Sequence, residues 1–466
     1  MEAIEEIALS ETLKLRGIAT VLPASDYHLS PDLILPFVAA AESASGRSIE
    51  LLCFENGPPE HIVLHGLEKT PVVLSVRQIG LLHRLRQLEA EMFDGPGLRE
   101  RLAEGMALAT MAEFFLPHGP VPFAAYAFMR SRITDEKTIF GDVRALGGAR
   151  HDLVELLAEP RNENSVCCLF YGLAHELGHV QQSQPTGAST RPPWCDDHEL
   201  ITLVERVAAT MKGSSGRLFC TNGPASSLHP RKLRLEANAD IEAARMLARV
   251  TPPMMRECDL GRPPDASCFV AALLATVFSM GFIAACRRQV AVLLHEGDFT
   301  SELLDLLQRP IAFAARQALL RSHTPMILCD LFGAIHDMPP TELDALPADL
   351  TARLTGVWDN EFERFLPVAM ALDAGLLRAM AALEPGNFTV AGYDQVFEAW
   401  RNKRLYPVDP ATVLFMRLAH SMALSEERLM DLHRLLLVND EEFMAIHSTS
   451  SSNLLDYILG GTADYR

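Results

Sequence analysis

The stretch NSVCCLFYGLAHELGHVQQSQ, residues 164–184, is the part of this sequence from which both fold and chemistry can be argued first. Gly178 within it lacks a side chain, so a helix here could pack closely against a neighbour, at a cost of about 1 kcal/mol in helix propensity relative to alanine. The spacing of the apolar residues predicts a helix over residues 165–182. Those residues recur at steps of three and four, as on one buried helix face, and are Val166, Phe170, Leu173 and Leu177.

Two histidines and a glutamate in this stretch form the pattern HExxH. His175 and His179 are four residues apart, so in a helix both imidazoles lie on one face and can bind one metal ion. Zinc accepts imidazole nitrogen at about 2.0–2.1 Å. Glu176 is displaced around the helix from both histidines, so it can approach a metal-bound water as a general base without being a ligand. The pattern predicts a zinc site with Glu176 as catalytic residue; a helix with two surface histidines is the alternative.

A second strong helix is predicted over residues 232–249, in KLRLEANADIEAARMLARV (232–250). A catalytic zinc ion has three protein ligands and one open position, so Glu236 is the expected third ligand. Asp240 lies one turn further on the same face, where it can accept the ring N–H of a ligating histidine and fix its tautomer. Glu242 is the alternative third ligand, although no carboxylate follows it four residues later.

HELGH followed by EANAD resembles the gluzincin zinc metallopeptidases, in which HExxH precedes a downstream ExxAD. The resemblance is closer to the Lit-type phage-exclusion peptidases than to the HtpX-like membrane peptidases, and it covers only about residues 165–250. It implies a zincin-like helical core, bound Zn²⁺ and cleavage of a protein or peptide substrate. The family roles then fall on His175, Glu176, His179, Glu236 and Asp240.

The regions outside this segment give the fold class. Helical patterns dominate from about residue 100 to the end, for example at 411–424 and 426–438. Before about residue 90 the pattern is mixed, with a helix over 79–93 and three short β-branched runs bounded by turn residues at 48–54, 61–67 and 70–76. We therefore expect a mainly α (α+β) fold.

Three regions are predicted along the chain, because 466 residues exceed one compact domain. They are a mixed α/β N-terminal region (1–150), a metallopeptidase domain (151–337) and a helical C-terminal region (338–466).

Composition limits the partners and the compartment. The formal net charge of -19 disfavours nucleic acid as a partner, because phosphate backbones repel an acidic chain. The nine cysteines show no disulfide-framework or CxxC spacing, which favours reduced thiols and a cytoplasmic location. The N-terminus, acidic at its start, has no apolar signal region.

The uncharged run ASCFVAALLATVFSMGFIAAC, residues 266–286, is long enough to cross a bilayer, which takes about 20 apolar residues. A helix buried in a large core has the same composition, and we favour this interpretation over membrane insertion. Membrane association therefore stays open as an alternative.

Other chemical signals are weaker. His323 could stabilise an oxyanion, but a single histidine near a helix end is more often structural. A polar loop with metal-capable groups runs over Cys195–Glu199, where solvation is the simpler explanation. No P-loop, dinucleotide or serine-hydrolase motif occurs.

The sequence therefore predicts a zinc-dependent endopeptidase. Two alternatives stay open. One is a metallopeptidase-like regulatory or sensor protein of bacterial stress or phage defence, which binds a partner or cleaves a repressor. The other is a membrane-anchored peptidase. An intact Glu176 favours the enzyme, since a protein that only binds zinc has no need of it.

Overall fold

The fold is taken from a computed structural model, and the account below is confined to the residues that it describes. They are residues 13, 18, 21–23, 31–54, 60–64, 69–75, 78, 98–118, 163–182, 194, 198, 200–206, 230–257, 263–295, 301–339 and 345–383. These residues are mainly helical, with a small mixed sheet near the N-terminus, which confirms the predicted fold class.

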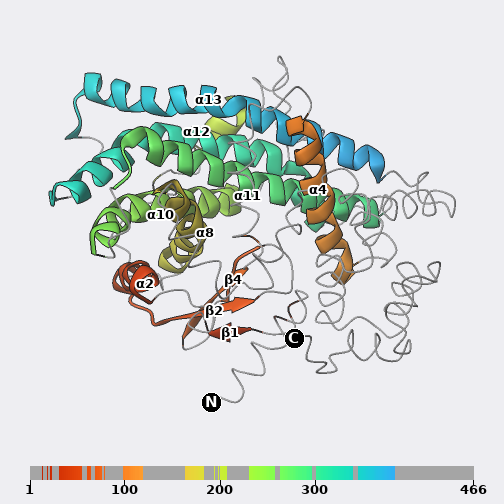
Figure 1. The fold of residues 1–466 in the computed structure, drawn as a ribbon, viewed down its shortest axis with the longest axis horizontal. Coiled ribbons are helices and arrows are strands. Elements are labelled where there is room, and N and C mark those ends of the chain that lie inside the picture. Colours follow the sequence, from red (N-terminus) through yellow and green to blue (C-terminus); the bar gives the residue numbers. More distant parts are fainter. Residues whose placement is uncertain are drawn as a thin grey trace.

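Long helices form the bulk of the described structure and lie side by side above the sheet (Figure 1). Helix α10 contacts α12, and α11 lies against both α12 and α13. A shorter helix, α4 (Leu98–His118), packs across α13 and α11. The long helices are α10 (Pro230–Glu257), α11 (Ala266–His295), α12 (Ser301–Ile335) and α13 (Ala348–Ala382).

Helix α8, Glu163–Gln182, connects the helical layer to the sheet. It begins two residues before the predicted 165–182 and ends as predicted. On one side it packs against α10 and α11, and on the other against α2 (Pro31–Ser45) and strands β3 and β4. The histidine pair of α8 therefore lies in the interior of the fold.

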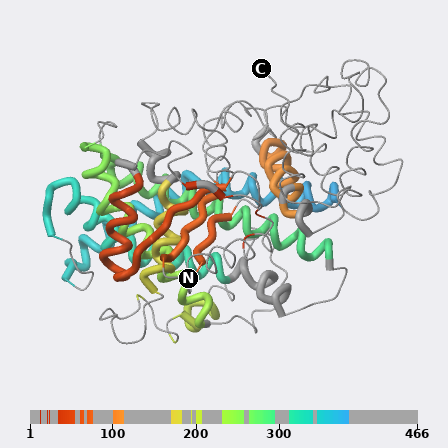
Figure 2. The backbone as a smooth tube through the Cα atoms, turned by 90° about the horizontal axis from the view of Figure 1, so that it is seen from below, coloured from red at the N-terminus to blue at the C-terminus, as the bar shows by residue number. Residues whose placement is uncertain are grey.

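The sheet has four strands in the order β1-β2-β4-β3. The central pair β2 and β4 is parallel, and the two short outer strands pair antiparallel to them. Viewed from below, the strands and α2 lie over the helices (Figure 2). The strands are β1 (Leu22–Pro23), β2 (Ile49–Phe54), β3 (Ile62–Val63) and β4 (Thr70–Ser75).

Strand β4 is buried along its whole length, because it has apolar neighbours on both faces. Successive side chains of a strand point to opposite faces. Val72 and Leu74 accordingly join the main core with the helices, whereas Val73 joins a smaller cluster with Leu52 and Phe54 of β2. This two-sided burial explains why the sequence shows a continuous apolar run here instead of an alternating one.

The uncharged run at 266–286 forms most of α11, and 72% of its most apolar window is buried inside the protein. Its hydroxyls bond within the helix: Thr276 donates to the Ala272 carbonyl at 2.9 Å and Ser279 to the Ala275 carbonyl at 2.6 Å. By length and composition α11 and α13 could each cross a membrane, a test that buried core helices also pass. The run packs against α8, the helix that holds the histidine pair.

Strand β3 and helix α10 also differ from their predicted bounds. Strand β3 is Ile62–Val63, and His61 and Leu64 of the predicted 61–67 lie outside it. Helix α10 does not end at residue 249 but continues through Pro252 and Pro253 to Glu257. Two prolines remove two N–H donors, yet this last turn buries Met254 and Met255 in the core, which offsets the loss.

The predicted helices at 79–93, 411–424 and 426–438 lie outside the described residues. The division of the chain into three regions stays a prediction.

Candidate metal centre

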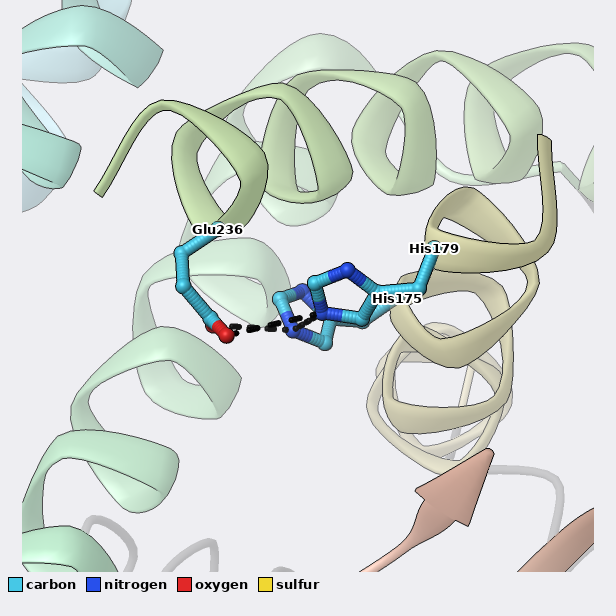
Figure 3. Close-up of side chains that lie close together, drawn as sticks. All are labelled: His175, His179 and Glu236. Atoms are coloured by element: carbon cyan, nitrogen blue, oxygen red, sulfur yellow. Dashed lines mark hydrogen bonds and ion pairs between the residues drawn. The ribbon is translucent and has the colours of Figure 1, made fainter. Parts of the chain in front are cut away.

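Three side chains from two helices meet at one point, where His175 is buried and His179 and Glu236 are partly buried. His175 and His179 project from α8, and Glu236 approaches them from α10 (Figure 3). The Nε2 atoms of the two histidines are 3.2 Å apart. Glu236 places Oε2 3.5 Å from His175 Nε2 and Oε1 3.7 Å from His179 Nε2. The structure thus brings together the three residues that the sequence predicts as metal ligands.

These separations suit a tetrahedral metal ion. Zinc bonds to histidine nitrogen and carboxylate oxygen at about 2.0–2.2 Å, so two ligand atoms of a tetrahedral site are about 3.3–3.5 Å apart. The two imidazole nitrogens are 3.2 Å apart, and the nearest distances from them to Glu236 are 3.5 Å to Oε2 and 3.7 Å to Oε1, all close to this value. With one ligand atom taken from each residue, the three atoms lie within 4.8 Å of one another. Two imidazoles and a carboxylate are also a donor set that zinc accepts. The three side chains therefore form a group that could hold a metal ion.

Asp240 lies behind His175, one helical turn beyond Glu236. Its Oδ1 atom is 3.0 Å from His175 Nδ1, and the Asp240 side chain is almost fully buried. A carboxylate at this position favours a proton on Nδ1, which leaves the lone pair of Nε2 for a metal. Tyr171, one turn before His175 on α8, donates its hydroxyl hydrogen to the same Oδ1 over 3.0 Å.

Arg316 of α12 completes the surroundings of the two carboxylates. Its Nε donates to Asp240 Oδ2 at 2.5 Å and one terminal nitrogen donates to Oδ1 at 2.8 Å, which makes a two-pronged ion pair. Its other terminal nitrogen lies 3.3 Å from Glu236 Oε2. Sequence reasoning missed Arg316, which lies 76 residues along the chain from Asp240 and belongs to no motif. It also missed Tyr171, although its spacing of four residues from His175 could have placed both on one helix face.

Both carboxylates are ionised at neutral pH. Burial raises the pKa of Glu236, but hydrogen bonding to His175 and the charge of Arg316 outweigh it and hold that pKa well below its usual range. Burial acts on Asp240 in the same way, and Arg316 and then His175 keep its pKa low.

The pKa values of the two histidines shift in opposite directions, although both side chains lie beside the same carboxylates. Burial lowers the pKa of His175, yet Asp240 and Glu236 outweigh this effect and raise it to about 10. The pKa of His179 falls to about 4, because burial and the neighbouring positive charge of His175 both disfavour its protonation. The carboxylates thus make this a place where positive charge is stabilised.

Gly178 sets the distance between α8 and α10. A methyl group at this position would lie 3.0 Å from the Ala239 carbonyl oxygen and 3.1 Å from the Ala239 Cα atom. Helix α8 thus contacts the backbone of α10 directly, one residue from His179 on one side and Asp240 on the other. The close packing expected for Gly178 is confirmed, and it is this approach that lets side chains of both helices meet.

His61 supports α8 from the side of the sheet. The N–H of Ser75 donates to His61 Nδ1 at 2.9 Å, and the ring lies against Gly172, where an added methyl group would come within 2.6 Å of it. Burial and then the charge of His175 lower the pKa of His61 to about 3, so its ring is neutral. The neutral ring of His61 therefore packs against α8 from the side of the sheet.

Glu176 follows His175 on α8 and is half-buried. Its position in the helix is the one predicted, and its catalytic role stays a prediction.

The alternative third ligand, Glu242, lies elsewhere. Its Oε1 atom accepts a hydrogen bond from the indole nitrogen of Trp194 at 2.7 Å, and Arg245 lies over the ring of that tryptophan, 4.4 Å from its centre. The His323 ring makes an edge contact with the same indole ring, and its Nδ1 atom is 2.9 Å from the Leu319 carbonyl oxygen. Of the predicted loop group 195–199, the structure describes only His198, which is exposed.

No protein-family model matches the chain, and searches of curated proteins and of solved structures find no similar protein. The residues themselves therefore carry the interpretation: a mainly helical protein with a partly buried His-His-Glu group that could hold a metal ion.

Proposed function

We propose that this chain is a zinc-dependent metallopeptidase of the gluzincin kind that cleaves a protein or peptide substrate. One observation carries the proposal: His175, His179 and Glu236, from two separate helices, place one ligand atom each within 4.8 Å of one another. A chance HExxH match on a surface helix would have no reason to meet a third ligand. The resemblance of HELGH and EANAD to the gluzincin pattern supports the same conclusion.

Each residue then has a defined task. His175, His179 and Glu236 hold the ion, and Asp240 keeps the His175 ring oriented with Nε2 toward it. Zinc in such a site acts as a Lewis acid that polarises a carbonyl oxygen and lowers the pKa of water to about 7. Glu176 takes up the proton of the attacking water and delivers it to the departing amine of the cleaved peptide bond.

We further propose that the protein acts in the cytoplasm. Among the described cysteines, Cys53, Cys268, Cys286 and Cys329 are all free thiols, which suits a reducing compartment. The acidic charge of the chain supports a protein substrate over a nucleic acid.

The test compares wild-type protein with Glu176→Gln, which keeps the side chain's size but cannot accept a proton at neutral pH. Zinc content is measured on the purified proteins, and new protein N-termini are compared in cells that express either one. We expect one zinc ion per chain in both proteins. Loss of the general base is expected to lower cleavage by about 10²–10⁴-fold. Glu242→Gln is the matched control, because Glu242 bonds Trp194 instead of joining the ligand group.

The outcomes separate the candidate functions. Zinc in both proteins with cleavage lost only in Glu176→Gln supports a peptidase. Zinc in both proteins with identical N-termini would favour a metal-binding regulatory protein. Absence of zinc after reconstitution would refute the metal centre itself.

A further inference from the structure

Arg316 of α12 forms ion pairs with both carboxylates that α10 contributes to the candidate metal centre. It lies in the middle of that helix and faces both α10 carboxylates. Two of its nitrogens bind Asp240 at 2.5 and 2.8 Å, and the third lies 3.3 Å from Glu236 Oε2. All three guanidinium nitrogens are therefore directed at carboxylates of the site.

The burial of Asp240 explains why an arginine is needed here. The Asp240 side chain is 1% exposed, and a buried carboxylate without a cationic partner is strongly destabilising. A guanidinium is planar and always charged, and it binds both oxygens of a carboxylate at once, which a lysine ammonium does not do. Arg316 thus fixes the rotation of the Asp240 carboxylate as well as its charge.

The same guanidinium also distinguishes the two oxygens of Glu236. Oε2 lies 3.3 Å from Arg316 and 3.5 Å from His175 Nε2, whereas Oε1 lies 3.7 Å from His179 Nε2. Arg316 therefore favours an orientation of the Glu236 carboxylate in which Oε2 is directed toward His175 and Oε1 toward His179.

We propose that Arg316 is a positioning residue of the metal centre: it holds Asp240 against His175 and fixes the orientation of the Glu236 carboxylate toward the two histidines. The proposal rests on the metal centre assigned above. Through Arg316, α12 becomes the third helix that builds the site, although it supplies no ligand.

A purely structural role, joining α10 to α12, is already filled elsewhere. Arg245 of α10 binds Asp330 of α12 at 2.7 Å, and both side chains are buried. Arg249, one turn further along α10, binds the same carboxylate at 3.0 Å. These pairs hold the two helices together without touching the ligands, so Arg316 is available for a task at the metal.

The experiment uses the full-length protein with Arg316→Lys and Arg316→Met. Arg321→Met is the matched control, because Arg321 lies on the same helix and binds Asp359 of α13 with the same two-pronged geometry, at 2.6 Å for both bonds. Zinc affinity is measured by competition with a chromophoric chelator. The visible absorption spectrum of the Co²⁺-substituted protein reports the coordination number and symmetry, and circular dichroism reports folding.

We expect zinc affinity to fall by about 10–100-fold in Arg316→Met, the range seen when a partner that orients a metal ligand is lost. Arg316→Lys should have a zinc affinity between those of Arg316→Met and the wild type. Lysine restores the positive charge but cannot bind both oxygens of the Asp240 carboxylate at once. Both variants should show a changed cobalt spectrum, because the guanidinium no longer fixes the orientation of the Glu236 carboxylate. Arg321→Met should match the wild type in affinity and spectrum.

Wild-type affinity and an unchanged spectrum in folded Arg316→Lys would overturn the role of Arg316 while leaving the metal centre intact. If Arg316→Met does not fold, Arg316→Lys decides the question by itself. A wild-type protein that binds neither zinc nor cobalt would overturn the metal centre, and this inference with it.

Discussion

The carboxylate of Asp240 has partners on two helices besides its own: His175 and Tyr171 on α8, and Arg316 on α12. A single acidic residue thus joins a metal-binding histidine to the positive charge that keeps the acid ionised. The sequence suggested the first of these contacts by spacing alone, since Asp240 lies one turn beyond Glu236. The other two depend on side chains that no motif marks.

Replacing Asp240 by asparagine should weaken metal binding without removing a ligand. The amide is neutral, so it no longer holds the proton on His175 Nδ1, and it leaves the charge of Arg316 poorly compensated. We expect zinc affinity to fall by about 10–100-fold, measured by chelator competition. Asp359→Asn is the control, because it removes the exposed partner of Arg321 and should leave affinity unchanged. Equal zinc affinity in Asp240→Asn and wild type would argue against a role in orienting His175.

At the scale of elements, the contact of α8 with α10 determines whether the ligands meet. The separation of these helices is set where Gly178 touches the backbone of Ala239. Apolar periodicity predicted both helices and the inward face of each. Apolar periodicity could not predict the distance between α8 and α10, because this distance depends on which residues of the two helices lie opposite each other.

Gly178→Ala should destabilise the protein although alanine is the better helix former. Its methyl group would lie 3.0 Å from the Ala239 carbonyl oxygen, so the helices must separate. Overpacking of this kind typically costs about 1–3 kcal/mol, against a gain of about 1 kcal/mol in propensity. Urea unfolding should show a lower midpoint for Gly178→Ala, together with weaker zinc binding.

Gly356→Ala on α13 is the matched control, since a methyl group there meets nothing within 4 Å. It should raise the free energy of unfolding by about 0.4–1 kcal/mol. If Gly178→Ala gave the same increase, the close packing of α8 on α10 would not be a constraint on the site.

Helix α11 provides a second prediction at this scale. Its most apolar window is 72% buried among other helices, so little of it is left to contact lipid. We expect the full-length protein to remain in the supernatant when cell membranes are sedimented, with no detergent present. Recovery in the membrane pellet, with release only by detergent, would show that α11 or α13 is inserted and would favour the membrane-anchored alternative.

At the scale of the whole molecule, the metal should join parts of the fold that are far apart in the sequence. The two histidines come from α8, which packs on the sheet, and Glu236 from α10, which packs on α12. An ion bound by both helices favours the folded state over the unfolded chain, in which the ligands are dispersed.

We therefore expect zinc to raise the thermal unfolding midpoint relative to protein treated with a chelator. At a free zinc concentration of about 100 times Kd, the stabilisation is about 2.7 kcal/mol. Glu176→Gln should show the same rise, because Glu176 is not a ligand. His179→Ala should show almost none, since two protein ligands hold zinc weakly. A full rise in His179→Ala would contradict the ligand assignment.

The sequence by itself determined the local part of this protein. Apolar periodicity identified α8 and α10, and the four-residue spacings put His175 with His179 and Glu236 with Asp240 on common helix faces. The short strands near the N-terminus also followed from local composition, whereas composition favoured burial of α11 without deciding between a buried helix and a membrane helix. Each of these depends only on residues within a few helical turns or one strand of each other.

Only the tertiary structure decided which carboxylate of α10 faces the histidines. Glu236 and Glu242 point in different directions around the helix, and the rotation of α10 against α8 turns Glu236 toward the site and Glu242 toward Trp194. Arg316 likewise reaches both α10 carboxylates only because α12 packs on α10. Helix rotation and helix packing are set by the whole core, summed over many weak contacts between distant residues, so no local pattern in the sequence carries them.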